Sequence, residues 1–104
     1  MTDNRRASFR HTVDLPVELS PAEGGAPAER RIGNLSLGGA FVLGEKIAMG
    51  RRLKVRFMIP TQADAVEVQA TVRWVTDEGI GLQFDGLRAR DVWSLGKYFE
   101  QLEG

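Results

Sequence analysis

Alternation of apolar and polar residues runs through most of the chain and predicts β-strands. Apolar residues occupy every second position of 13–19, 53–59 and 66–74, a period typical of strands that bury one face. Pro16 cannot donate a ladder hydrogen bond, so the first strand is expected at a sheet edge or with a bulge. Trp74 shares the parity of the buried face and is predicted to be a core residue. The predicted strands are 13–19, 28–35, 40–43, 53–59, 66–74 and 80–84.

The period changes after Asp85-Gly86, where apolar residues recur at helical spacing. Val92, Leu95, Phe99 and Leu102 form a stripe that predicts an amphipathic helix over about 87–102. Trp93 lies off this stripe, which favours a contact surface. Five or six short antiparallel strands avoid open edges by closing into a barrel, with the helix over an end or a seam. No internal repeat is visible.

Composition restricts the function classes. The 104 residues suit one domain, and 14 basic residues balance 14 acidic ones, so a nucleic-acid coat or a polybasic membrane binder is disfavoured. A basic strand face at 51–56 lacks interleaved aromatic residues and is explained by solvation. Without cysteines, a signal peptide or a long apolar run, we expect a cytoplasmic protein that does not insert into membranes. We also expect a complete single-domain chain that is monomeric or weakly dimeric.

Arginines cluster at the start of the chain. Arg5, Arg6 and Arg10 lie within six residues, and only Asp3 is near enough to neutralise them. A guanidinium is planar, permanently charged and carries five donors in a fixed fork. It can bind a phosphate, pair with the Hoogsteen edge of guanine or stack on a base. The cluster therefore suggests a site for a small guanine-containing phosphodiester; the alternative is a solvated, charged terminus.

A second polar group joins two predicted strands. Period two places Asn34 and Ser36 on one face, and Gly39 permits close approach of a ligand to the backbone. Their donors and acceptors could read a base edge or hold a phosphate oxygen. The alternative is an ordinary turn, because Asn, Ser and Gly are turn formers.

Enzymatic chemistry is not supported by the sequence. It contains no Cys or His cluster for a metal and no glycine-rich phosphate loop at a helix start. Ser36 has no evident base in the sequence. His11 is the only histidine, and a lone histidine is best explained as a partly exposed strand residue. We therefore expect no enzymatic activity, no metal and no cofactor.

Taken together, the two polar groups resemble the motif of the PilZ family, bacterial receptors for cyclic di-GMP. That motif has two arginines with three residues between them, then Asp or Asn, any residue, Ser, two residues and Gly. The first part is Arg6-Ala7-Ser8-Phe9-Arg10, and the second is Asn34-Leu35-Ser36-Leu37-Gly38-Gly39. The segments 73–75 and 79–84 also look like the family, so the resemblance covers nearly the whole chain.

The resemblance implies a mainly β fold, a six-stranded antiparallel barrel with a C-terminal helix. It divides the chain into a flexible ligand-binding segment, residues 1–12, and the barrel with its helix, residues 13–104. It also implies a receptor that orders its N-terminal loop on cyclic di-GMP and signals in trans to an effector protein controlling motility, biofilm or polysaccharide output. The alternative is a PilZ-fold interaction module, for example in motility machinery, that acts independently of the nucleotide.

Site residues follow from the same resemblance by motif position. Arg6 and Arg10 would contact phosphate and the guanine Hoogsteen edge, and Arg5 would stack on a second nucleotide. Asn34 and Ser36 would hydrogen-bond the other guanine or its sugar-phosphate, with Gly39 leaving room. Asn accepts with one oxygen where Asp would offer two, so weaker affinity is expected than in an Asp-bearing relative.

Overall fold

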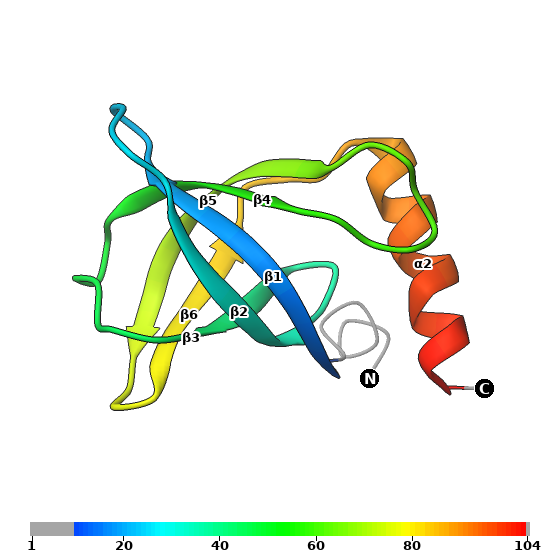
Figure 1. The fold of residues 1–104 in the computed structure, drawn as a ribbon, viewed down its shortest axis with the longest axis horizontal. Coiled ribbons are helices and arrows are strands. Elements are labelled where there is room, and N and C mark those ends of the chain that lie inside the picture. Colours follow the sequence, from blue (N-terminus) through cyan, green and yellow to red (C-terminus); the bar gives the residue numbers. More distant parts are fainter. Residues whose placement is uncertain (1–9, 104) are drawn as a thin grey trace, which may run out of the picture.

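The computed structural model describes residues 10–103, which form six strands and one helix (Figure 1). The observed elements are β1 (His11–Pro21), β2 (Ala28–Leu35), β3 (Gly39–Leu43), β4 (Arg52–Phe57), β5 (Val66–Val75), β6 (Gly79–Phe84) and α2 (Ala89–Glu103). The predicted strand segments and the C-terminal helix are confirmed to within a few residues. The division into a segment 1–12 and a barrel 13–104 stays a prediction.

The strands close into an antiparallel barrel in the order β1-β2-β3-β6-β5-β4. The predicted mainly β barrel is therefore confirmed, and closure leaves no strand without two neighbours. Pro16 nevertheless lies where the proline, which lacks a backbone N–H group, is tolerated. It lies in the β1–β2 ladder opposite Arg31, whereas the β1–β4 ladder begins only at Val17. The bulge in β1 falls between Thr12 and Leu15 rather than at Pro16 itself.

Alternate side chains of the strands fill the barrel. In β4, and in β5 from Val66 to Arg73, the alternation is regular: the apolar residues are buried and the charged and amide residues between them are exposed. Across the two strands Arg56 lies opposite Glu67, and the Nε atom of Arg56 donates to Oε2 of Glu67 at 3.0 Å. The fully buried residues of the barrel include Ile32, Leu35, Val42, Val55, Val66, Val72, Ile80 and Leu82.

Helix α2 lies beside one end of the barrel (Figure 1) and contributes Leu95, Tyr98 and Phe99 to the core. Its buried face is rotated from the predicted stripe, since Val92 and Leu102 are exposed. A polar anchor explains the rotation: the carboxylate of Asp91 is fully buried and accepts hydrogen bonds from Gln62 and Arg88.

Two hairpins of the barrel repeat the same backbone plan. In β2–β3, Ile32 pairs with Val42, a bulge follows, and Asn34 pairs with Phe41. In β5–β6 every one of these pairs recurs 40 residues later, including the bulge, so that Trp74 pairs with Gly81. Because β3 and β6 are themselves antiparallel neighbours centred on Phe41 and Gly81, the two hairpins are related by a local two-fold axis. No extended sequence repeat accompanies this correspondence; the trace that the two hairpins share is a hydroxyl residue three positions before a glycine, at 36–39 and 76–79.

Candidate functional site

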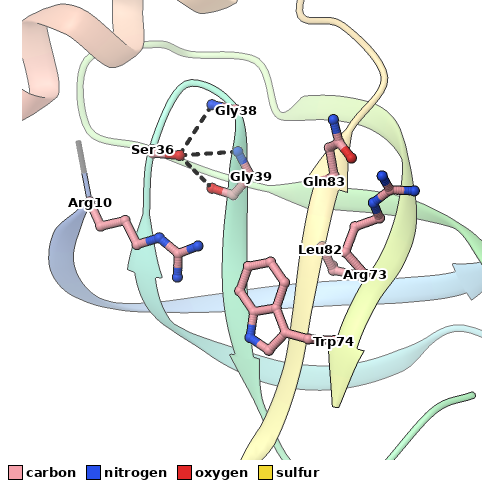
Figure 2. A pocket seen from close by; sticks show the side chains of 8 residues that line it. All are labelled: Arg10, Ser36, Gly38, Gly39, Arg73, Trp74, Leu82 and Gln83. Atoms are coloured by element: carbon pink, nitrogen blue, oxygen red, sulfur yellow. Dashed lines mark hydrogen bonds between the residues drawn. The ribbon is translucent and has the colours of Figure 1, made fainter. Parts of the chain in front are cut away.

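A cavity of about 280 Å³ opens on the outer face of the barrel where β3, β6 and β5 meet the start of β1 (Figure 2). It lies outside the apolar interior, so a ligand can reach it without opening the core. Its lining residues are Arg10, Ser36, Gly38, Gly39, Arg73, Trp74, Leu82 and Gln83. Of the residues predicted for the site, it brings together Arg10, Ser36 and Gly39.

Trp74 lies in this cavity rather than in the core, so its predicted core position is wrong. The bulge between Val72 and Trp74 shifts the phase of β5 by one residue. Val75 consequently packs against the core in the place that strict alternation would have assigned to Trp74. The indole lies flat over Gly81, where an added Cβ would come within 1.9 Å of the ring. Only glycine at position 81 allows this half-buried platform.

The charged residues that line the cavity are both arginines. The guanidinium carbon of Arg10 lies 4.8 Å from the Trp74 ring centroid, and Figure 2 shows the group pointing toward the indole. This is a cation–π arrangement, worth about 0.5–1 kcal/mol at an exposed site. Arg73 flanks the cavity from β5. A flat aromatic surface beside two cations suits a planar ligand that carries negative charge.

Ser36 builds the turn that forms the opposite wall. Its hydroxyl oxygen accepts hydrogen bonds from the backbone N–H groups of Gly38 and Gly39, both at 3.1 Å, and lies 3.3 Å from the Gly39 carbonyl, to which it donates. These contacts are dashed in Figure 2. Thr76 does the same at the two-fold-related turn, where its hydroxyl bonds the N–H groups of Glu78 and Gly79. The hydroxyl at position 36 is thus already engaged in shaping the turn.

The barrel itself requires glycine at position 39, a requirement separate from the predicted role of leaving room for a ligand. A Cβ there would lie 2.0 Å from the carbonyl oxygen of Leu82, on the neighbouring strand. At the related position, a Cβ on Gly79 would lie 2.1 Å from the carbonyl oxygen of Val42. Position 79 lies outside the nucleotide motif, yet it has the same restriction. Close approach of β3 to β6 is therefore sufficient to require glycine at both positions.

Asn34 does not line the cavity. It lies in β2 opposite Thr12 and Phe41, and its Oδ1 atom is buried without a hydrogen-bond partner among residues 10–103. An unsatisfied buried acceptor costs roughly 1–3 kcal/mol. Asn34 is two residues away from Ser36, which lines the cavity. A hydrogen-bond donor that reached its Oδ1 atom would therefore be stabilising.

Arg5 and Arg6, the other two predicted arginines, lie outside the described residues. The residue after Arg10, however, ties the start of β1 to the C-terminal helix. The imidazole of His11 stacks on Phe99 at a centroid distance of 4.2 Å and an interplanar angle of 7°. Its Nε2 atom lies 2.8 Å from Oε2 of Glu103. The cavity and α2 are thus linked through two consecutive residues, Arg10 and His11.

Sequence reasoning did not assign five of the lining residues to the site, namely Gly38, Arg73, Trp74, Leu82 and Gln83. The signal for Trp74 was present but indirect. A hydroxyl residue followed three positions later by glycine occurs at both 36–39 and 76–79, and it marks two equivalent hairpins. Comparing them would have placed Trp74 at the same bulge position as Asn34, off the core face.

Other site classes find no support in the part of the chain that the structure describes. Residues 10–103 contain no group of three or more His, Cys, Asp or Glu side chains placed to hold a metal. Within the same range, α2 is too short and too polar to cross a bilayer.

Comparison with known proteins places this geometry in context. The sequence profile described as "PilZ domain" matches residues 4–101. No curated protein matches the chain in sequence. Among solved structures, the chain is similar to the Bacillus subtilis inhibitor of motility MotI/DgrA, with a TM-score of 0.68 and 20% identity over 88% of this chain. It spans only 50% of that protein's chain.

A second similar structure is the PilZ domain of CeSA from a cellulose-synthesizing bacterium. Its TM-score is 0.69 at 18% identity, and the match covers 92% of this chain and 99% of that domain. At these identities both likenesses concern the fold.

Proposed function

Because the chain belongs to the PilZ domain family, we propose that it is a cyclic di-GMP receptor that acts as an adaptor for a partner protein rather than as an enzyme. One observation carries the proposal. The cavity beside Trp74 offers an aromatic platform between Arg10 and Arg73 and contains no carboxylate among its described lining residues. A dianionic ligand with two planar guanine rings is complementary to such a surface.

In the proposed complex, Arg10 moves from the indole onto the ligand. Its guanidinium binds a phosphate or the Hoogsteen edge of one guanine, and the base takes its place over Trp74. Arg6 assists Arg10, and Arg5 stacks on a second nucleotide when two are bound.

The second half of the motif contributes mainly through shape. Ser36 and Gly39 hold the turn that forms one wall and keep β3 close against β6. The buried Oδ1 atom of Asn34 gains a donor when the ligand presents a guanine N–H group. This hydrogen bond forms only in the bound state and therefore contributes to the binding free energy.

The ligand signal then reaches α2 through His11. Repositioning Arg10 shifts its chain neighbour, and His11 contacts Phe99 and Glu103 on the helix. The gain must exceed the entropy of ordering the N-terminal residues, roughly 1–2 kcal/mol for each backbone unit. We propose that the changed helix surface is read by a partner in motility or polysaccharide control. One structural neighbour is named an inhibitor of motility, and the other is a PilZ domain from a cellulose-synthesizing bacterium.

The test is a calorimetric titration with cyclic di-GMP, with GTP and cyclic GMP as control ligands. The expected result is saturable binding of cyclic di-GMP alone, lost in Arg10→Ala and Arg6→Ala. Arg56→Ala is the matched control, since Arg56 pairs with Glu67 on another face of the barrel. Equal binding by Arg10→Ala and the wild type would refute this site, and a ratio of two ligands per chain would implicate Arg5.

A second candidate function is supported by the outer face of α2. Trp93 is 64% exposed beside the exposed Val92, and the Lys97 ammonium lies 5.4 Å from its ring centroid. Exposed tryptophan is enriched among residues that dominate protein interfaces. This supports an interaction module that works without the nucleotide.

Complementation of a deletion strain separates the two candidates. The receptor requires that Arg10→Ala abolish the phenotype, whereas the nucleotide-independent module requires that Arg10→Ala be silent and Trp93→Ala be defective. Glu100→Ala on the same helix serves as the control for a general effect of altering α2.

A further inference from the structure

A second cavity, of about 360 Å³, lies where the β1–β2 hairpin meets the loop 44–51 that joins β3 to β4. It shares no lining residue with the cavity beside Trp74. Its volume falls within the range of small-molecule sites, roughly 300–1,000 Å³. Its lining residues are Leu19, Pro21, Ala26, Ala28, Arg30, Lys46, Ile47, Ala48, Arg51 and Leu53.

The chemistry of this lining is divided into two parts. Every uncharged residue in it is apolar, and Leu19 and Leu53 at the base are each only 3% exposed. The charged lining residues described, Arg30, Lys46 and Arg51, are all cations. In a chain with as many acidic as basic residues, an all-cationic rim around an apolar base is a local departure from the average surface.

Two of these cations can exchange their present partners for a ligand. Lys46 lies 3.1 Å from Asp77, and Arg51 lies 3.6 Å from Glu23. Both carboxylates are on the surface, with side chains 97% and 71% exposed. Ion pairs of this kind contribute little stability and are readily replaced.

The third cation is held in place by the backbone. The Nη1 atom of Arg30 donates to the carbonyl oxygen of Glu45 at 2.7 Å, which leaves the remaining guanidinium donors for an anion. Arg30 therefore forms the fixed part of the rim, and Lys46 and Arg51 form the adjustable part.

We propose that this cavity binds a short aliphatic anion, an acyl chain ending in a carboxylate. The methylene groups lie on Leu19, Ile47 and Leu53, and the carboxylate lies between the cations of the rim. The site is independent of the nucleotide site, because neither cavity uses a residue of the other.

The probe is octanoate, titrated into the ¹⁵N-labelled full chain and followed by amide NMR. We expect saturable shifts at Ile47 and Ala48 and none at the Trp74 indole. Over the series butanoate, hexanoate and octanoate, affinity should rise about fourfold for each methylene that the apolar base covers. Octanol and methyl octanoate, which lack the charge, should bind more weakly than octanoate.

Variants test the location of the site. Ala28→Trp fills the cavity and should abolish the shifts, whereas Ala22→Trp, on the same hairpin but outside the lining, should leave them intact. Arg51→Gln is a milder change that should weaken binding up to about fivefold, the limit for a partly exposed ion pair. Thermal unfolding of each variant establishes that it is folded.

Three outcomes would overturn the proposal. These are no saturable shift with octanoate, equal binding of octanol and octanoate, or undiminished binding by a folded Ala28→Trp. Loss of binding in Ala28→Trp and its weakening in Arg51→Gln, with Ala22→Trp unaffected, would establish the site.

Discussion

Replacing Gly39 with alanine tests whether this glycine serves the ligand or the barrel. The motif assigns Gly39 to the nucleotide site, but in the structure its missing side chain is what lets β3 approach β6. The added Cβ would lie 2.0 Å from the carbonyl oxygen of Leu82. Backbone atoms cannot rotate aside as a flexible side chain can, so the two strands must separate locally.

The expected cost follows from that displacement. Overpacking of a well-packed site costs typically about 1–3 kcal/mol, and each ladder hydrogen bond that is weakened adds up to about 1 kcal/mol. We expect Gly39→Ala to lower the free energy of unfolding by about 3 kcal/mol. For a domain of this size, that corresponds to a fall in Tm of about 10–20 °C.

Two further glycine-to-alanine variants serve as matched controls for Gly39→Ala. Gly79→Ala places a Cβ 2.1 Å from the carbonyl oxygen of Val42 at the two-fold-related turn and should lose about as much stability, although it lies outside the nucleotide motif. Gly38→Ala is the tolerant neighbour, because its nearest contact would be the Ser36 hydroxyl oxygen at 3.9 Å. Urea unfolding followed by circular dichroism measures all three.

A Gly39→Ala protein as stable as the wild type would refute the steric argument. If that protein also failed to bind cyclic di-GMP, the absence of a side chain at position 39 would serve to leave space for the ligand, as the motif alone suggests. If Gly79→Ala were harmless while Gly39→Ala was destabilising, the equivalence of the two hairpins would be wrong.

Three further predictions concern single side chains. Trp74→Ala should weaken cyclic di-GMP binding roughly 5- to 150-fold in calorimetry, because stacking on an aromatic platform contributes about 1–3 kcal/mol for each base; it should leave Tm nearly unchanged, and an unaltered affinity would remove Trp74 from the site. Asn34→Val should stabilise the free protein by about 1 kcal/mol in urea unfolding by deleting an unsatisfied buried acceptor, while weakening nucleotide binding; loss of stability would instead show that the amide is satisfied. Burial alone favours the protonated form of Asp91, but hydrogen bonds from Arg88 and Gln62, with the nearby arginine charges, outweigh it and lower the pKa of its carboxyl below the ordinary 3.8. A lowered folded-state pKa contributes stability that is present above pH 3.8 and lost as the pH falls below it, so Asp91→Asn should flatten the acid limb of stability against pH; an unchanged acid limb would contradict the anchoring role of Asp91.

Much of the barrel could be predicted from local pattern. The alternation in 53–57 and 66–72 reports which face of each strand is buried, since adjacent strand residues point to opposite sides. The change of period after Gly86 likewise predicts the helix. Its buried face was predicted less well, because the pattern could not reveal that Asp91 would be buried against Gln62.

The candidate site was predicted only in part, again because residue spacing is visible in the sequence and tertiary contacts are not. Arg10, Ser36 and Gly39 carry a motif whose spacing is a property of the chain, and they do meet at one cavity. Trp74 could not be placed by parity, because a bulge shifts the register by one residue and moves every following side chain to the other face. Asn34 lies in β2 between β1 and β3 and does not line the cavity, so its predicted contact with the ligand stays a prediction.

The sequence by itself thus determined the strand and helix periods, the absence of net charge and the family motif, all of which depend on residue type and spacing along the chain. Only the tertiary structure decided what depends on contacts between distant segments. It turned Trp74 outward onto Gly81, brought β3 so close to β6 that positions 39 and 79 admit only glycine, and joined Arg10 through His11 to α2. These features arise from closure of the barrel, which places residues 40 positions apart on either side of one local two-fold axis.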